Sequence, residues 1–357
     1  MMSPTVILLI MVTYFSVSFI VVSRSVVVAI DPEYELVNRI RQVDQAIVNV
    51  LGYLQNYDAA NNSLTNESDV TFWCSHRNQL PYRQVHINDP NITSKFNFSL
   101  PVAFLIHGWF DSVNRTWMNN TMSAYVQNID SNICGVDWTR LALTEYSIAA
   151  TNTRIVAKQL VKFIQYLQLF SSVSIKHWTL IGHSFGAQIS GIAGHQLNGA
   201  VGTIIGLDPA GWLYTKPVPI DTDERLDKSD AQFVQCIHTN ANYFGIGATM
   251  NCGHQDFYPN DGLSPQPGCV DPAMESGMTH FSITCSHFKA VQYFLYSLNP
   301  ANMFKAWKCS LGYYWWEAGF CKSKTYDLLG MYSRRKLFGS LYLKTSTYPP
   351  YAKGKPK

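Results

Sequence analysis

The sequence predicts an α/β protein whose central sheet is mostly parallel and is covered by helices on both faces. One observation is a short apolar run, residues 178–181, that leads into Gly182-His183-Ser184-Phe185-Gly186 and then into a helical pattern, residues 187–197. Another is that strand-like and helix-like runs alternate along the chain, as they do in parallel sheets. A strand that enters a helix through Gly-x-Ser-x-Gly is the nucleophile elbow of the α/β-hydrolase fold, which is therefore the fold we expect.

The predicted elements follow one another from residue 70. Apolar runs predict strands at residues 70–74, 101–106, 133–138, 178–181, 201–207 and 233–238. Apolar residues at helical spacing predict helices at 117–126, 152–169, 187–197 and 288–297. Ahead of them, residues 33–57 have helical spacing after Asp31-Pro32. We therefore expect a hydrolase domain at 70–350, a helical segment and linker at 26–69, and a basic tail at 351–357.

Composition and the first residues indicate where the protein acts. The chain has 357 residues, 14% of them charged, and a net charge of +3, which gives no sign of nucleic-acid binding. Residues 6–22 are mostly apolar, and this predicts a signal peptide over residues 1–25, with cleavage after Ser25 or Ala29. A retained membrane anchor is the alternative, because about 17 apolar residues just reach spanning length.

Glycosylation sequons and cysteines independently favour a secreted, extracellular protein. Eight cysteines, an even number, suit an oxidising compartment. Asn-x-Ser/Thr sequons cluster in the first third of the chain, as expected of a glycosylated surface. They begin at Asn61, Asn66, Asn91, Asn97, Asn114 and Asn119.

The elbow serine needs partners downstream in the chain. A serine hydroxyl requires a histidine base, and the base requires a carboxylate that fixes its tautomer. In α/β-hydrolases these follow in the order Ser, acid, His. Ser184 is the candidate nucleophile, and Asp208 is the best candidate acid because it follows the next strand. The alternative for Asp208 is a turn-forming residue before proline.

The residue pattern does not decide which histidine is the catalytic base. The candidates are His238, His254, His280 and His287. His238 ends a strand, His254 follows a glycine, and His287 follows Cys285-Ser286 and precedes a helix. An oxyanion hole needs two backbone amides. One is expected from Phe185 and the other from the junction at His107-Gly108-Trp109.

A series of motifs follows in order along the chain. They are His107-Gly108-Trp109, Asn152-Thr153-Arg154, the elbow, Gly206-Leu207-Asp208-Pro209-Ala210, Ile237-His238-Thr239, Gly253-His254-Gln255-Asp256-Phe257-Tyr258-Pro259-Asn260, Pro267-Gly268-Cys269 and Cys285-Ser286-His287. In this order they resemble the pancreatic lipase family of animal lipases and phospholipases A1, and the resemblance covers roughly residues 70 to 350.

The resemblance implies a triad of Ser184, Asp208 and His287, with the amides of Trp109 and Phe185 as the oxyanion hole. It makes the segment around His254 and Asp256 structural. It implies a serine hydrolase of triacylglycerol lipase type that acts on lipid at a membrane or emulsion interface. Phospholipase A1 activity at the sn-1 ester is one alternative. A non-catalytic, yolk-like lipid-binding protein is an alternative of another class, and the intact triad positions count against it. A general esterase or peptidase is a third.

The resemblance implies no cofactor except a structural calcium ion. Its ligands would be the carboxylates of Asp227 and Asp230, the carbonyl of Arg225 and a carbonyl near Thr222. Oxygen ligands of this kind suit calcium. A solvated acidic loop is the alternative, because the loop between Asp208 and Arg225 is longer than the family's usual one.

The same resemblance implies that Cys269 pairs with Cys285 and encloses a lid of 15 residues, 270–284, which is short for a triglyceride lipase. Cys309 and Cys321 flank an aromatic loop and are expected to pair. For the other four cysteines we expect Cys74 to pair with Cys134 and Cys236 with Cys252, although eight cysteines allow about 105 connectivities and the sequence does not choose among them. No C-terminal β-sandwich is expected, so the lid and the loop at 242–252 would meet the lipid. The aromatic run at 313–316 either joins them or packs in the core.

Overall fold

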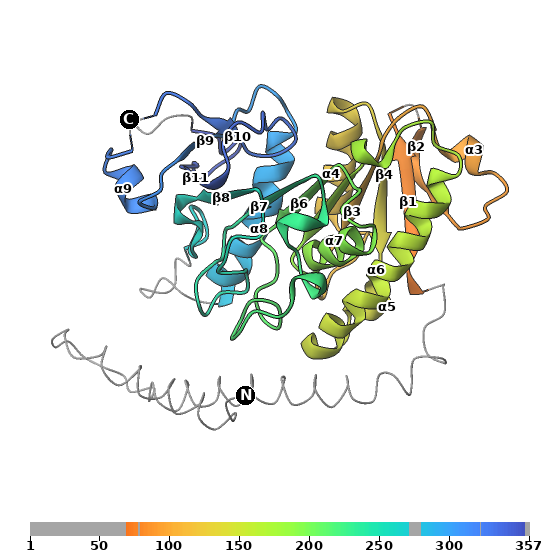
Figure 1. Ribbon diagram of the computed structural model, residues 1–357, viewed down its shortest axis with the longest axis horizontal. Coiled ribbons are helices and arrows are strands. Elements are labelled where there is room, and N and C mark those ends of the chain that lie inside the picture. Colours follow the sequence, from red (N-terminus) through yellow and green to blue (C-terminus); the bar gives the residue numbers. More distant parts are fainter. Residues whose placement is uncertain (1–68, 78, 271–279, 322, 354–357) are drawn as a thin grey trace. The chain divides into compact units, whose positions relative to one another are not determined.

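The computed structural model describes residues 69–77, 79–270, 280–321 and 323–353 (Figure 1). The expected signal peptide, the helix at 33–57, the sequons at Asn61 and Asn66 and most of the expected lid lie outside these residues.

The described residues form one sheet of eleven strands in the order β10-β9-β11-β8-β7-β6-β5-β3-β4-β1-β2. From β11 to β4 every neighbouring pair is parallel, and the pairs at both edges are antiparallel. The strands are β1 Thr71–His76, β2 Gln79–Val85, β3 Val102–Ile106, β4 Asn132–Asp137, β5 Thr179–His183, β6 Thr203–Leu207, β7 Phe233–Ile237, β8 Gln255–Pro259, β9 Lys305–Lys308, β10 Asp327–Leu328 and β11 Gly339–Leu343. The predicted mostly parallel α/β-hydrolase sheet is confirmed.

Helices cover both faces of this sheet (Figure 1). The α-helices are α3 Ile92–Lys95, α4 Thr116–Asn128, α5 Thr139–Ala142, α6 Tyr146–Gln168, α7 Phe185–Gln196, α8 His280–Ser297 and α9 Tyr313–Glu317. Short 3₁₀ turns are η2 Ile175–His177, η3 Thr222–Glu224, η4 Lys228–Asp230 and η5 Asn260–Gly262. Helices α5, α6 and α7 pack on one face, and α4 and α8 pack on the other.

The central strands are apolar on both sides because both of their faces are covered. In β3, Phe104 and Ile106 contact the cluster under α6 and α7, whereas Ala103 and Leu105 contact the cluster under α4 and α8. Strand β2 lies at the edge and contains Pro81, which has no amide hydrogen to donate to a further strand.

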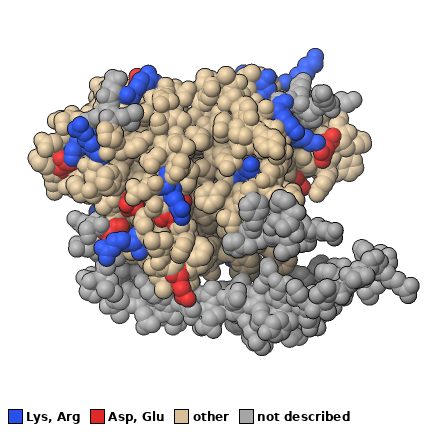
Figure 2. Space-filling view, turned by 180° about the vertical axis from the view of Figure 1, so that it is seen from behind, with Lys and Arg blue, Asp and Glu red and all other residues tan. Residues whose placement is uncertain are grey.

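Charge is sparse on the surface. On the face that Figure 2 shows, lysines and arginines are scattered among aspartates and glutamates rather than gathered into one patch. On this face the distribution agrees with the small net charge of +3.

Candidate active site

Ser184 lies between β5 and α7 in a strained conformation. Its φ of 57° and ψ of −118° are unusual for a residue with a side chain. The turn is crowded on both sides: a Cβ atom at Gly182 would lie 2.0 Å from the Gly186 carbonyl oxygen, and one at Gly186 would lie 2.2 Å from the Ile106 carbonyl oxygen. The two glycines of the motif are therefore a steric requirement of the elbow.

Asp208 and His287 form a buried pair near the elbow. Asp208 follows β6 and is fully buried, and His287 lies in α8 with 5% of its surface exposed. His287 Nδ1 donates to Asp208 Oδ2 at 2.6 Å. The other carboxylate oxygen accepts the amides of Thr239 and Asn240 at 2.7 and 3.0 Å. The carboxylate is therefore fixed on both sides, and it orients the imidazole.

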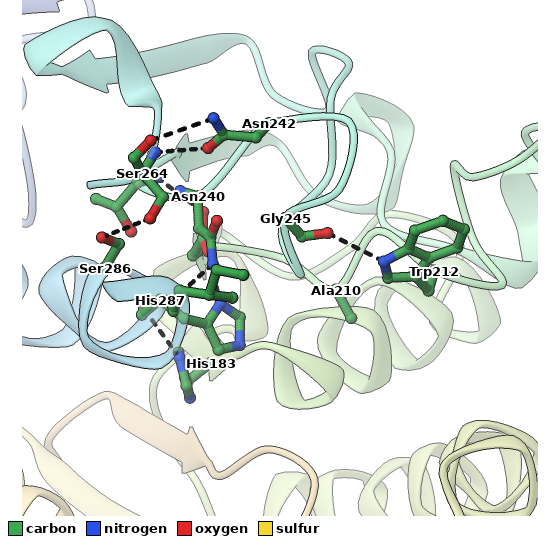
Figure 3. Close-up of polar contacts among 12 residues, drawn as sticks. His183, Ala210, Trp212, Asn240, Asn242, Gly245, Ser264, Ser286 and His287 are labelled. Atoms are coloured by element: carbon green, nitrogen blue, oxygen red, sulfur yellow. Dashed lines mark hydrogen bonds and ion pairs between the residues drawn. The ribbon is translucent and has the colours of Figure 1, made fainter. Parts of the chain in front are cut away.

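Asn240 connects the acid to the helix that carries the base. Its backbone amide donates to Asp208, and its side-chain Nδ2 donates to the carbonyl of Ile283 in α8 at 2.8 Å. Figure 3 shows Asn240 next to His287 at this junction. The position of α8 is thus tied to the same loop that holds the carboxylate.

His183, the residue before the serine, brings the elbow and the base together. Its Nε2 donates to the His287 carbonyl at 3.3 Å, and the two rings lie 4.5 Å apart (Figure 3). Burial and the neighbouring His287 hold the pKa of His183 well below its ordinary value. Within the described residues no hydrogen bond joins the Ser184 hydroxyl to His287. Such a bond often tightens only when substrate binds.

The two expected oxyanion amides belong to adjoining segments. A Cβ at Gly108 would lie 2.8 Å from the Ser184 Cβ, so the loop that carries Trp109 passes directly beside the serine. Tyr146 packs between Trp109 and Phe185, with ring centroids 5.1 and 4.7 Å away. Neither the Trp109 amide nor the Phe185 amide donates to another residue of the described chain.

The other candidate histidines have their own partners. His238 is fully buried and contacts Asp256 Oδ1 at 2.9 Å, and His254 Nδ1 accepts the Val234 amide at 3.0 Å. Cys236 and Cys252 flank the His238–Asp256 pair, but they are joined to each other as a disulfide and offer no thiolates to a metal. The His280 side chain lies outside the described residues.

Asp230 has the features of a cation ligand. It is fully buried in η4, and its Oδ2 accepts the Asp227 amide at 2.7 Å. Its Oδ1 has no hydrogen-bond partner in the described structure and lies 3.9 Å from His195 Nδ1. Burial raises the pKa of Asp230 to about 8. Asp227 caps η4 and accepts the Ser229 amide at 3.0 Å. A buried carboxylate oxygen that accepts no hydrogen bond fits an oxygen-ligated cation.

The structure pairs all eight cysteines. The disulfides are Cys74–Cys134, Cys236–Cys252, Cys269–Cys285 and Cys309–Cys321. The aromatic run at 313–316 is divided, because Tyr313 and Trp316 are buried whereas Tyr314 and Trp315 are exposed. The four sequon asparagines that the structure describes are all exposed: Asn91, Asn97, Asn114 and Asn119.

The sheet order, the strained serine between a strand and a helix, and the buried His–Asp pair at the strand ends place the chain in the α/β-hydrolase class. Over residues 37–351 the chain matches the family model described as Lipase, and it belongs to that family.

Curated relatives agree with this family. The chain is 33% identical over 244 residues to pancreatic lipase-related protein 2 of Mus musculus, covering 64% of this chain and 50% of that protein. It is 38% identical over 236 residues to hepatic triacylglycerol lipase of Homo sapiens, and the match covers 61% of this chain and 46% of that protein. It is 35% identical over 260 residues to lipase member H of Oryctolagus cuniculus, and the match covers 71% of this chain and 55% of that protein. The chain thus spans about half the length of the curated relatives it matches.

Several functional contacts were not predicted from the sequence. The amides of Thr239 and Asn240 could have been found, because β7 runs beside β6 and the residues after parallel strands meet at one edge. His183 lies inside the motif itself, but nothing in the pattern shows that it contacts His287.

Among the described helices, none is both long and apolar enough to span a membrane.

Proposed function

We propose that this protein is a secreted serine hydrolase that cleaves acyl esters of glycerolipids. The observation that carries the proposal is the 2.6 Å contact between His287 and Asp208 beside the strained elbow of Ser184, in a chain of the Lipase family. Each of these side chains has a defined task in acyl transfer.

The proposed reaction has two halves. Ser184 Oγ attacks the ester carbonyl while His287 Nε2 takes its proton, and Asp208 stabilises the imidazolium. The amides of Trp109 and Phe185 donate to the oxyanion. His287 then gives the proton to the leaving alcohol, and the ester bond breaks. In the second half His287 takes a proton from a water molecule, and the water oxygen attacks the carbonyl of the acyl-enzyme. His287 then returns the proton to Ser184 Oγ as the bond from Oγ to the acyl carbon breaks, which releases the fatty acid and free Ser184.

Exposed apolar side chains near the strand ends support a lipid substrate. Trp109 is 40% exposed and Phe110 is 62% exposed, and both follow β3. The Phe110 amide donates to the Ala142 carbonyl at the end of α5, next to the exposed Leu143. Apolar residues that gather around a polar site are typical of surfaces that bind lipid or protein partners.

A structural calcium ion would be held by Asp227, Asp230, the carbonyl of Arg225 and a carbonyl near Thr222. It would neutralise the buried Asp230 carboxylate and stabilise the segment that packs on α7. That packing is close, since a Cβ at Gly194 would lie 2.3 Å from the Asp230 carbonyl oxygen. The ion takes no part in the chemical steps above, and serine chemistry of this kind uses no organic cofactor.

Secretion is proposed on independent grounds. Four disulfides are typical of an oxidising compartment. The exposed positions of Asn91, Asn97, Asn114 and Asn119 would accept glycans without disturbing the core.

The test is fatty-acid release from a triglyceride emulsion and from phosphatidylcholine vesicles, with Ser184→Ala as the matched control. Release from the emulsion that the variant abolishes would support triacylglycerol lipase activity. Release from phosphatidylcholine alone, with a 2-acyl lysolipid as the product, would favour phospholipase A1, which the short expected lid of 15 residues also favours. Equal release by Ser184→Ala would refute the proposed function.

A further inference from the structure

A buried lysine next to the site has no role in the reaction described above. Lys216 lies in the loop of residues 209–221 that follows Asp208, and only 2% of its surface is exposed. Lysine is rarely buried, because removing an ammonium group from water is costly unless other groups compensate. Within the described residues no ion pair includes Lys216.

The partners of Lys216 are two carbonyls and an aromatic ring. Its Nζ donates to the carbonyls of Asn242 and Gly245, at 2.8 and 2.9 Å, and lies 5.6 Å from the centre of the Trp212 ring. Burial lowers the pKa of Lys216 to about 8, and the charge of Asp208 partly opposes this shift. The ammonium is thus held by two carbonyls of a neighbouring loop and lies near one ring of its own loop.

That neighbour is the 242–252 loop, and it is fastened at the same point by a second side chain. Trp212 Nε1 also donates to the Gly245 carbonyl, at 3.0 Å (Figure 3). Beyond Gly245 the two loops form a short antiparallel pair, with the Gly211 amide bonded to Ile246 and the Ala248 amide bonded to Pro209. Lys216 therefore joins the two loops at the end of this antiparallel pair.

The fastened loop reaches from the catalytic acid to the surface. At one end, a Cβ at Gly247 would lie 2.7 Å from Asp208 Oδ1, so the loop backbone covers the carboxylate. At the other end, Tyr243 and Phe244 are 46% and 40% exposed, with rings 5.2 Å apart. Tyr243 also contacts Trp212, with ring centroids 6.4 Å apart.

We propose that Lys216 is a specificity-determining residue whose ammonium holds the 242–252 loop as a preformed wall of the active-site entrance, with Tyr243 and Phe244 presented to a lipid surface. This proposal rests on the proposed ester hydrolysis at Ser184. On this proposal, a lipid drawn from an interface passes Tyr243 and Phe244 on its way to Ser184, whereas a soluble ester does not depend on them. Loss of the ammonium should therefore affect interfacial substrates more than soluble ones.

The test replaces Lys216 with methionine, which has similar length and no donor. Lys305→Met is the matched control, because Lys305 also lies over an aromatic ring, 4.8 Å from the centre of Tyr326, in strand β9. Hydrogen exchange of the amides at residues 243–247 reports on the loop directly. Activity is compared on a soluble short-chain ester and on a triglyceride emulsion.

We expect Lys216→Met to speed exchange at 243–247 by about tenfold or more, since two charge-assisted hydrogen bonds are lost. Turnover of the soluble ester should stay within about twofold, while activity on the emulsion falls about tenfold. Lys305→Met should change none of these. Should Lys216→Met fail to fold, Trp212→Phe removes the other donor to Gly245 and should give the same pattern.

Three results would overturn the inference. Unchanged exchange at 243–247 would show that Lys216 does not hold the loop. An equal loss on both substrates would assign Lys216 a general structural role. A larger loss on the soluble ester would reverse the proposed specificity. A wild-type protein that hydrolyses no ester would refute the proposed function instead, and the exchange measurement would still decide whether Lys216 holds the loop.

Discussion

Replacing Asp208 with asparagine should prevent His287 from acting as the general base, without unfolding the protein. One carboxylate oxygen accepts the Thr239 and Asn240 amides, and the other accepts His287 Nδ1 at 2.6 Å. In Asp208→Asn the single carbonyl oxygen must satisfy the two backbone amides, so the NH₂ group faces Nδ1. Nδ1 must then accept, and the proton moves to Nε2, the atom that should deprotonate Ser184.

The expected cost follows from this tautomer change. A serine–histidine site with the wrong tautomer loses about 10⁴ in kcat, or about 5.5 kcal/mol of transition-state stabilisation. Folding should be preserved, because the two side chains have nearly the same shape and the backbone amides keep their acceptor. Steady-state hydrolysis of a soluble short-chain ester, together with thermal unfolding, measures both quantities.

Asp256→Asn is the matched control for this prediction. Asp256 is also fully buried and also contacts a histidine, His238 at 2.9 Å, but it lies in strand β8 and outside the proposed triad. The Asp256→Asn substitution should lower the melting temperature and leave kcat of the folded enzyme nearly unchanged. Retention of more than about a tenth of kcat by Asp208→Asn, or an equal loss in Asp256→Asn, would refute the assignment of the acid.

Other variants test the oxyanion loop, the cation site and the buried lysine. Gly108→Ala places a Cβ 2.8 Å from the Ser184 Cβ and should lower kcat at least about tenfold in a protein that still folds; unchanged kcat would contradict the close passage of this loop. Calcium at about 100 times its Kd should raise the free energy of unfolding by about 2.7 kcal/mol. Addition of EDTA or the substitution Asp230→Asn should abolish this gain. A melting temperature that does not change with calcium would exclude the ion. Lys216 has a folded-state pKa of about 8 and an unfolded value of 10.5, so between these values the folded protein has released a proton that the unfolded chain still binds. Wild-type stability should therefore rise relative to Lys216→Met, by about 3 kcal/mol from pH 8 to pH 10.5 in urea titrations; a constant difference would contradict the burial of a charged amine.

The sequence predicted strands β1 and β3 to β7 and helices α4, α6 and α7 because their patterns are local, whereas the interior strand β8 was not predicted. Helix α7 and strands β5 and β6 were predicted within a few residues, since buried apolar runs and the glycine motif define them. The start of α8 was predicted at residue 288 but lies at His280. Its first turns contain serine, threonine and isoleucine, which are poor helix formers, and the contact from Asn240 to Ile283 helps to hold them.

The edge strands and the burial of Lys216 were not predicted, because the sequence lacks a local pattern for either of them. Strand β10 has only two residues, and β2 contains Pro81, so neither has a readable strand pattern. Lys216 follows a threonine and precedes a proline in what reads as an exposed loop. It is buried only because Asn242 and Gly245, far along the chain, supply carbonyls. Such long-range contacts leave no trace in a single sequence.

The most direct test of the account is covalent labelling by a fluorescent organophosphonate, a reagent that reacts with activated serines. We predict stoichiometric labelling of the peptide that contains Ser184, no labelling in Ser184→Ala, and labelling slowed by orders of magnitude in Asp208→Asn. A folded wild-type protein with intact disulfides that takes up no label at Ser184 would contradict the central claim and favour a lipid-binding protein without catalysis.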